Sequence, residues 1–341
     1  MKSNYRYIVK AFMAMAVIAG TTSCDDFLDR EPMSSISPET YYSTAAQLEA
    51  NLNDEYPNVL PSFGQWTYGI FGEDKGTDNQ IEVNANDRYT QDRWKVPHSE
   101  SDNWKFERIY RINFFLSEAL PKFGEDMSGS QNTISGSVAT IKHYIGEMYF
   151  LRAYEYFKKL QLFGDFPIIN QPLADEMEAL REASKRFPRN EVARFIISDL
   201  DKAYAYMSDV DMATTRINKD VAMLVKSRVA LFEATWLQNF KGTAFVPGGE
   251  GWPGASLHNN YQYPSGNIDN EVKYFLEQAV EASKLVADKY KGSLTENTGV
   301  LQQSADDPSN PYFDMFAQED LSDVKEVLLW RQYARGLSTH N

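Results

Sequence analysis

Two glycine- and proline-rich stretches of the sequence hold the side chains best suited to bind a ligand. Both stretches, residues 57–103 and 241–267, look irregular and are rich in aromatic residues. Aromatic rings bury much area in a core, but on a loop they also stack against flat ligands. A long aromatic loop is therefore either functional or folded onto the core. The first stretch holds Trp66, Tyr68, Arg88, Tyr89, Arg93 and Trp94, and the second holds Trp252, Asn259, Asn260, Tyr261 and Tyr263.

Patterns that would indicate catalysis or a metal centre are weak. The sequence has no GxSxG, P-loop, GxGxxG or HExxH motif, and its four histidines are scattered. Its 48 acidic residues leave a glycosidase pair open by counting alone, but no spacing selects one. The acidic, glycine-rich stretch at 72–79 could offer oxygen ligands to calcium, yet it lacks the spacing of an EF-hand loop. A solvated turn is the favoured interpretation, and we expect no metal, no cofactor and no enzyme activity.

The first 23 residues have the layout of an export signal. Lys2, Arg6 and Lys10 form a basic start, residues 11–20 are apolar, and small residues follow. Ten apolar residues cover about half of the ~20 that a membrane-spanning helix needs. The sequence therefore predicts a cleaved signal peptide rather than a transmembrane anchor.

Cys24 follows the small residues directly and is the only cysteine of the chain. Its position resembles the lipobox of bacterial lipoproteins, although Thr21 stands where a larger aliphatic residue is usual. The alternative is a free thiol. We expect lipidation of Cys24, attachment to the membrane through the lipid alone, and a mature chain of residues 24–341. The acidic run after Cys24 resembles the surface-export signal of lipoproteins in the Bacteroides group.

The charge of the chain limits its partners. The net charge is −14, and removal of residues 1–23 takes away three cations and no acid, which leaves −17. A nucleic-acid partner requires a basic face. We therefore expect no nucleic-acid binding and no docking by charge on an anionic lipid surface.

The segments that must position these loops are predicted to be helices. Apolar residues recur at helical spacing over 101–120, 138–163, 190–207, 219–239 and 270–290. A helix of about 16 residues is predicted after Ser37, ending before Pro57, and a short one at 312–316. Pro121 is predicted to end the 101–120 helix, and Trp104 and Trp236 to lie within helices in the core. The apolar run 325–333 is predicted to be a strand or an extended segment, with Trp330 in the core. Successive helical pairs suggest a tetratricopeptide-like stack.

Several segments occur together in an order that points to one family. They are CDDFLDREP (24–32), the helix with Trp104, Tyr110, Ile112 and Asn113, LRAYEYFKKLQLFGDFP (151–167), FIISDLDKA (195–203), RINKDVAMLVKSRVALFEA (216–234) and KEVLLWRQY (325–333). In this combination the chain resembles the SusD/RagB family of surface nutrient-binding lipoproteins. The resemblance implies a mainly α fold, the SusD-like α-α superhelix, in which tetratricopeptide-like hairpins pack with an irregular, loop-rich lobe. Arg152, Gly164 and Asp165 are expected to fix a helix and its terminating turn without touching ligand.

The resemblance also implies a function. It implies an outer-membrane, cell-surface lipoprotein that binds oligosaccharides and delivers them to a SusC-like TonB-dependent transporter. Family members usually run longer, so residues 24–341 are interpreted as one SusD-like domain that lacks its C-terminal part. A sugar has an apolar face for an aromatic platform and hydroxyls for polar side chains. The expected ligand residues are Trp66, Tyr68, Arg88, Tyr89, Trp94, Trp252, Tyr261 and Tyr263, each with the alternative that it packs inward. Alternative functions are a peptide-import partner, a ligand-free helical scaffold and a surface glycosidase.

Overall fold

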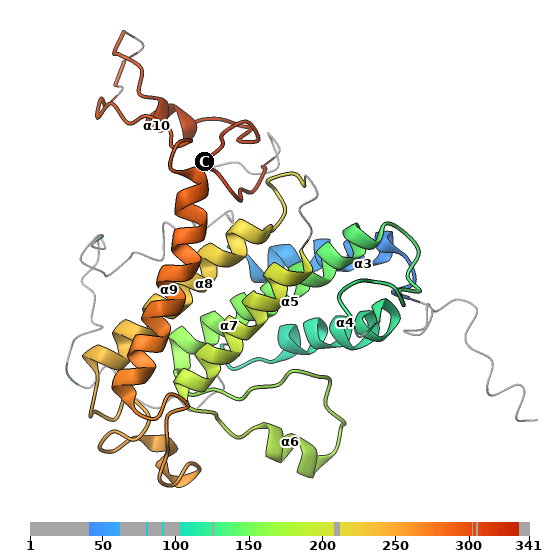
Figure 1. Ribbon diagram of the computed structural model, residues 1–341, viewed down its shortest axis with the longest axis vertical. Helices are drawn as coiled ribbons and strands as arrows, with labels where there is room; N and C mark the ends of the chain where they lie inside the picture. Colours follow the sequence, from blue (N-terminus) through green and yellow to red (C-terminus); the bar gives the residue numbers. More distant parts are fainter. Residues whose placement is uncertain are drawn as a thin grey trace, which may run out of the picture.

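The computed structural model describes residues 41–61, 80, 91, 103–124, 126–207, 212–301, 303–304 and 306–333. These residues form a mainly helical structure, and they contain no β-strand (Figure 1). Only isolated bridges occur among them, between Thr44 and Ser135 and between Phe166 and Phe187. The predicted mainly α fold is confirmed.

The helices follow one another along the chain with short or irregular connections. They are α3 (Ala45–Val59), α4 (Glu107–Phe123), α5 (Val138–Phe163), α6 (Met177–Ala183), α7 (Arg189–Tyr206), α8 (Lys219–Asn239), the 3-10 helix η3 (Pro253–Ser256), α9 (Ile268–Tyr290) and α10 (Pro311–Met315). Helices α3 and α4 pack on α5, α5 packs on α7, α7 on α8, and α8 on α9. The predicted pairing of neighbouring helices is present, and the pairs stack into one layered array.

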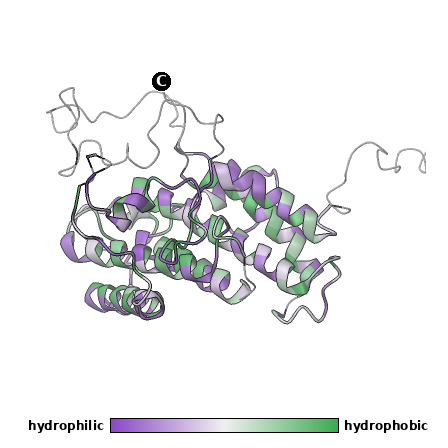
Figure 2. Ribbon diagram, turned by 90° about the horizontal axis from the view of Figure 1, so that it is seen from above, coloured by the Kyte–Doolittle hydropathy of each residue, from purple (hydrophilic) through white to green (hydrophobic). Residues whose placement is uncertain are grey.

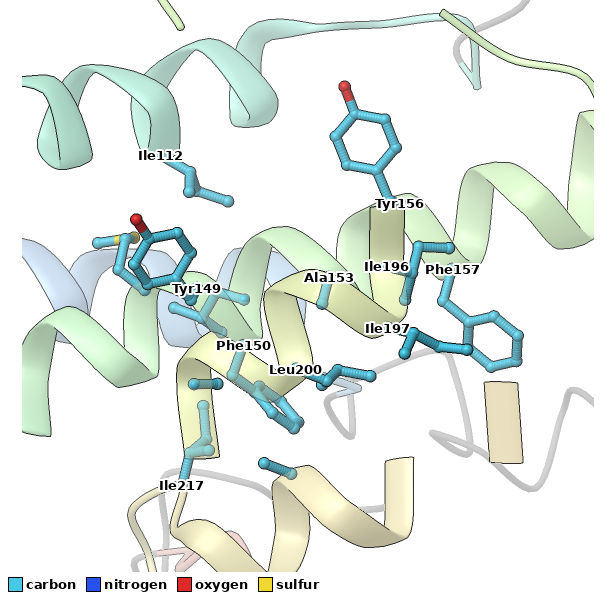
Figure 3. Packing of buried hydrophobic residues seen from close by; sticks show 14 of the residues in the cluster. Ile112, Tyr149, Phe150, Ala153, Tyr156, Phe157, Ile196, Ile197, Leu200 and Ile217 are labelled. Atoms are coloured by element: carbon cyan, nitrogen blue, oxygen red, sulfur yellow. The ribbon is translucent and has the colours of Figure 1, made fainter. Parts of the chain in front are cut away.

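The core lies between these stacked helices and is centred on α5, most of whose residues are buried. Figure 3 shows part of it, with Ile112 of α4, Phe150 of α5 and Leu200 of α7 in one apolar cluster. In Figure 2, hydrophobic and hydrophilic segments alternate along the helices, as expected for helices with one buried face. Burial of large side chains such as Phe150 stabilises each by about 1.5–3 kcal/mol. Packing in this apolar cluster holds the ends of α5 and α7 in fixed positions.

Buried arginine–carboxylate pairs connect the helices inside this core. Arg152 of α5 forms two hydrogen bonds to Asp199 of α7, of 2.7 and 2.8 Å, and a third to Asn113 of α4. Similar pairs join Arg189 to Glu233 and Arg194 to Glu271. A buried guanidinium must be paired, because an unpaired buried charge is strongly destabilising. The pairs therefore favour one arrangement of neighbouring helices. Arg152 has the structural role that the sequence predicted.

Two helices continue past prolines at which they were predicted to end. Pro57 lies inside α3 and Pro121 inside α4, each in the last turn. A proline this close to the end removes a single intrahelical hydrogen bond. The final residues of both helices, Val59 and Phe123, are buried, and their packing offsets that loss.

Other differences concern the edges of the predicted elements. Helix α3 has Thr44 as its N-cap, whereas the predicted start near Ser37 lies outside the described residues. Helix α4 begins at Glu107, so Trp104 precedes it and packs as a half-buried side chain against Phe163 and other rings. Helix α6 was not predicted.

The 325–333 segment forms no strand and packs against the residues that precede α8. The Trp330 indole N–H donates to the Thr214 hydroxyl at 2.8 Å, and the Trp330 backbone N–H donates to the Thr214 carbonyl. Trp330 is half-buried rather than fully in the core. None of the described helices is long and apolar enough to span a bilayer.

Candidate functional site

The turn that ends α5 connects the parts of the chain that form the candidate site. Gly164 stops the helix with a φ of 67°, a conformation that glycine adopts without steric cost. Asp165 follows, and its carboxylate accepts a hydrogen bond from the Arg189 backbone N–H at 2.9 Å and from the Trp252 indole N–H at 2.7 Å. Burial raises the pKa of Asp165, while these two hydrogen bonds oppose the rise. The turn therefore joins the end of α5 to the start of α7 and to the distant residue Trp252.

Residues 241–267, which we call the aromatic loop, are held against the helices by their own rings. Trp252 is 5% exposed and stacks with His258 at a centroid distance of 5.9 Å. The half-buried Tyr261 packs against Trp252 and donates its hydroxyl hydrogen to Asn190 at 3.0 Å. Tyr263 packs against Tyr261 and donates to the Pro247 carbonyl at 2.7 Å. The three predicted ligand residues of this loop thus lie together, with their polar atoms bonded within the protein.

The predicted residues of the first stretch, Trp66, Tyr68, Arg88, Tyr89 and Trp94, lie outside the described residues, as do Cys24 and the 72–79 stretch. The roles assigned to them from the sequence stay predictions. Within the described residues, no group of three or more histidine, cysteine or acidic side chains could hold a metal ion.

A cleft of about 780 Å³ opens between the end of α5, the end of α6 and the aromatic loop. In Figure 1, α6 and this loop lie at the same end of the helical stack. The volume falls within the ~300–1,000 Å³ typical of ligand sites. The lining residues are Gln161, Leu162, Phe163, Gly164, Asp165, Arg181, Ser184, Lys185, Arg186, Arg189, Trp236, Ala244, Phe245, Trp252, Pro253, Gly254 and Leu257. Of the predicted ligand residues, Trp252 lines this cleft.

The apolar wall of the cleft is open to solvent. Phe245, Leu162 and Leu257 are 61%, 58% and 53% exposed, although each is a large hydrophobic side chain. The Trp236 indole N–H donates to the Phe245 carbonyl at 3.1 Å, and the Phe245 ring packs edge-on against Phe240. These contacts hold Phe245 in the lining of the cleft. The sequence interpretation placed Trp236 in the core, whereas it is half-buried and lines the cleft.

The polar wall of the cleft is mainly cationic. Arg181, Lys185, Arg186 and Arg189 line it, and Asp165 is the one carboxylate among the described residues that line it. Sequence reasoning missed these side chains. A signal existed, because the nine residues 181–189 contain four cations in an acidic chain.

Comparison with known proteins identifies the family to which this chain belongs. A SusD-like family model, described as starch-binding and associating with the outer membrane, matches residues 26–231, more than half of the chain. The chain belongs to the SusD-like family. The match covers the cationic wall of the cleft and ends before the aromatic loop. The family resemblance drawn from sequence segments is confirmed.

Individual SusD-like relatives are distant. SusD-like protein P2 of Formosa agariphila is 25% identical over 253 residues, which are 71% of this chain and 46% of that protein. SusD-like protein P25 of the same organism is 25% identical over 233 residues, 63% of this chain and 41% of that protein. A solved SusD-like carbohydrate-binding protein of Bacteroides fragilis aligns at 15% identity with a TM-score of 0.44, over 76% of this chain and 43% of that one. The alignments thus span less than half of the length of these relatives.

Proposed function

We propose that this SusD-like protein captures oligosaccharides at the cell surface and passes them to a SusC-like TonB-dependent transporter of the outer membrane. Membership of a family described as starch-binding and associated with the outer membrane carries the proposal. Capture requires only binding, and the transporter would supply the energy for import. Cys24 would bear the lipid that holds the protein beside its transporter. The tether raises the effective concentration of the binding protein at the transporter mouth.

The cleft supports the binding part of this proposal. A sugar ring has one apolar face and a polar rim, so its site needs an exposed ring and nearby hydrogen-bonding groups. Phe245 offers an exposed ring, and the cationic side chains that line the same cleft offer donors. Trp252 would act as the buried support that keeps the aromatic loop in place. Trp66, Tyr68, Arg88, Tyr89 and Trp94 remain proposed contacts from the first stretch, and Tyr261 and Tyr263 from the second.

Calorimetric titration of the full-length protein against a panel of neutral and acidic glycans tests the binding. At least one glycan should bind with saturable heat. Copurification of the tagged protein with a TonB-dependent receptor from outer membranes tests the partner. Recovery of the folded protein without such a receptor would contradict the delivery role, and glycan hydrolysis by the purified protein would contradict a function limited to binding.

A further inference from the structure

The charge of the cleft is opposite to that of the molecule around it. The chain carries 48 acidic and 34 basic residues, yet the part of the chain that the structure describes lines the cleft with four cations and one carboxylate. A concave site lined by one sign of charge focuses its field and concentrates ligands of the other sign. An acidic protein with a cationic cleft therefore favours anions there while its remaining surface repels them.

The cations differ in how available they are to a ligand. Arg189 is not available to a ligand, because its buried guanidinium is paired with the carboxylate of Glu233. Arg186 has no carboxylate partner within the described part of the chain, and its guanidinium lies 4.6 Å from the centre of the Trp104 ring. A guanidinium stacked on a ring keeps its N–H groups free at its edge.

Arg181 and Lys185 are paired only with exposed carboxylates one turn away. The Arg181–Glu178 distance is 3.6 Å and the Lys185–Glu182 distance is 2.5 Å, and all four side chains are at least half exposed. Exposed pairs of this kind contribute little and exchange readily for another anion. Arg181, Lys185 and Arg186 are therefore the cations available to a ligand among the described lining residues.

The charged side chains that line the cleft are mainly hydrogen-bond donors. Arginine and lysine side chains donate hydrogen bonds and cannot accept them. Asp165 could accept, but both of its oxygens already bind protein N–H groups. The charged groups of the cleft thus provide donors, so the ligand that fits must bring acceptors. Carboxylate and sulfate oxygens are strong acceptors, and bonds from charged donors to them are about twice as strong as neutral ones.

We propose that the cleft binds an anionic glycan, a chain bearing carboxylate or sulfate groups. Arg181, Lys185 and Arg186 bind the acidic groups, and the exposed Phe245 ring packs against the apolar face of a sugar ring. The proposal rests on the proposed glycan-binding function and specifies its substrate class. The apolar wall formed by Leu162, Phe245 and Leu257 distinguishes this cleft from a site for a small inorganic anion.

Matched ligand pairs test the charge requirement on the full-length protein. One pair is an oligogalacturonide and its methyl-esterified form, and the other is a sulfated galactan oligosaccharide and its desulfated form. At least one anionic member should bind about tenfold or more tightly than its neutral counterpart at low ionic strength, and high salt should weaken it. The pair that shows the difference identifies the acidic group as carboxylate or sulfate.

A charge-matched set of variants locates the site. The triple variant Arg181→Gln, Lys185→Gln, Arg186→Gln should lose about tenfold or more of its affinity for the anionic ligand. The control Lys273→Gln, Lys284→Gln, Lys291→Gln removes the same charge from exposed positions on and beside α9, and its affinity should be unchanged. Thermal unfolding of both variants verifies that they fold.

The outcomes separate the two proposals. Equal binding of charged and neutral members, or equal losses in both triple variants, would overturn the anionic-glycan proposal and leave glycan capture standing. Absence of binding to every neutral and acidic glycan by the folded protein would overturn both.

Discussion

At the residue scale, Asp165 connects distant parts of the candidate site. Its two carboxylate oxygens hold the start of α7 and the indole of Trp252, which lies 87 residues away in the sequence. The sequence predicted a structural role for Asp165 within its own turn. It could not predict the partner, because nothing local in the sequence pairs an aspartate with one particular tryptophan of a distant loop.

Substitution Asp165→Ala should destabilise the fold and release the aromatic loop. The change leaves the largely buried Trp252 indole N–H without an acceptor, which costs about 1–3 kcal/mol. Urea unfolding measures that loss, and limited proteolysis should cut residues 241–267 faster. The matched control is Asp288→Ala, which breaks an exposed pair with Lys284 on α9 and should cost about 0–1 kcal/mol. Equal effects of the two substitutions would contradict the role assigned to Asp165.

Glu271 should make part of the stability depend on pH. Burial alone would raise its pKa, but hydrogen bonds from Arg194, Asn190 and Ser265 outweigh burial and lower the pKa below its ordinary value of 4.5. A carboxyl with a lowered folded-state pKa contributes stability above the unfolded-state pKa and loses it as pH falls through the folded-state pKa. The stability difference between the native protein and Glu271→Gln should therefore shrink as pH falls below 4.5.

Unfolding of both proteins in urea from about pH 7 to about pH 3 measures this difference. Glu277→Gln, an exposed change on the same helix, supplies the control for the loss of one acidic side chain and should cost no more than about 1 kcal/mol. A Glu271→Gln difference that stays constant, or grows, toward acid pH would be incompatible with a lowered pKa of Glu271 in the folded protein.

At the element scale, helix recognition from the sequence depends on how much of the helix is buried. The apolar patterns at 138–163 and 219–239 gave the bounds of α5 and α8 because those helices pack inside the stack. Helix α6 has no fully buried residue, so it left no apolar pattern to find. The cationic wall of the cleft comes from this helix and the residues after it, which explains why that half of the site was missed.

The Arg152–Asp199 pair should hold α5 against α7. Arg152→Ala alone should cost about 3–5 kcal/mol, because it leaves the carboxylate of Asp199 buried without its partner. Adding Asp199→Leu to Arg152→Met should cost less than the two single changes together, since no unpaired charge remains. Lys284→Ala, which breaks an exposed pair on α9, should cost no more than about 1 kcal/mol. Additive losses in urea unfolding would show that the pair is not coupled.

At the scale of the whole molecule, the cleft exists only because three separate parts of the chain meet. The end of α5, the end of α6 and the aromatic loop are brought together by the stacking of α5, α7 and α8. Sequence motifs were sufficient to recognise the family, since those segments are largely scaffold. They could not show which side chains share the cleft, because that depends on packing between residues that lie far apart in the sequence.

Cys24→Ala should release the protein from the outer membrane. Without the thiol there is no site for the acyl chains, and the net charge of −17 left without residues 1–23 disfavours docking on an anionic lipid surface. Fractionation of cells carrying Cys24→Ala should place the protein in the soluble fraction, while Ser35→Ala should leave it with the membrane. Glycan affinity should be the same in both. Membrane retention of the Cys24→Ala variant would contradict lipid anchoring at this residue.

The central claim is that this SusD-like protein binds a glycan in the cleft, and one titration tests it directly. The full-length protein and its Phe245→Ala variant are titrated with the glycan that the panel identifies, alongside Phe316→Ala, which removes another exposed ring on the C-terminal side of α10. We predict saturable binding that weakens about tenfold in Phe245→Ala, a loss of about 1.4 kcal/mol, and is unchanged in Phe316→Ala. Full affinity in a folded Phe245→Ala variant would place the glycan elsewhere and contradict glycan binding in this cleft.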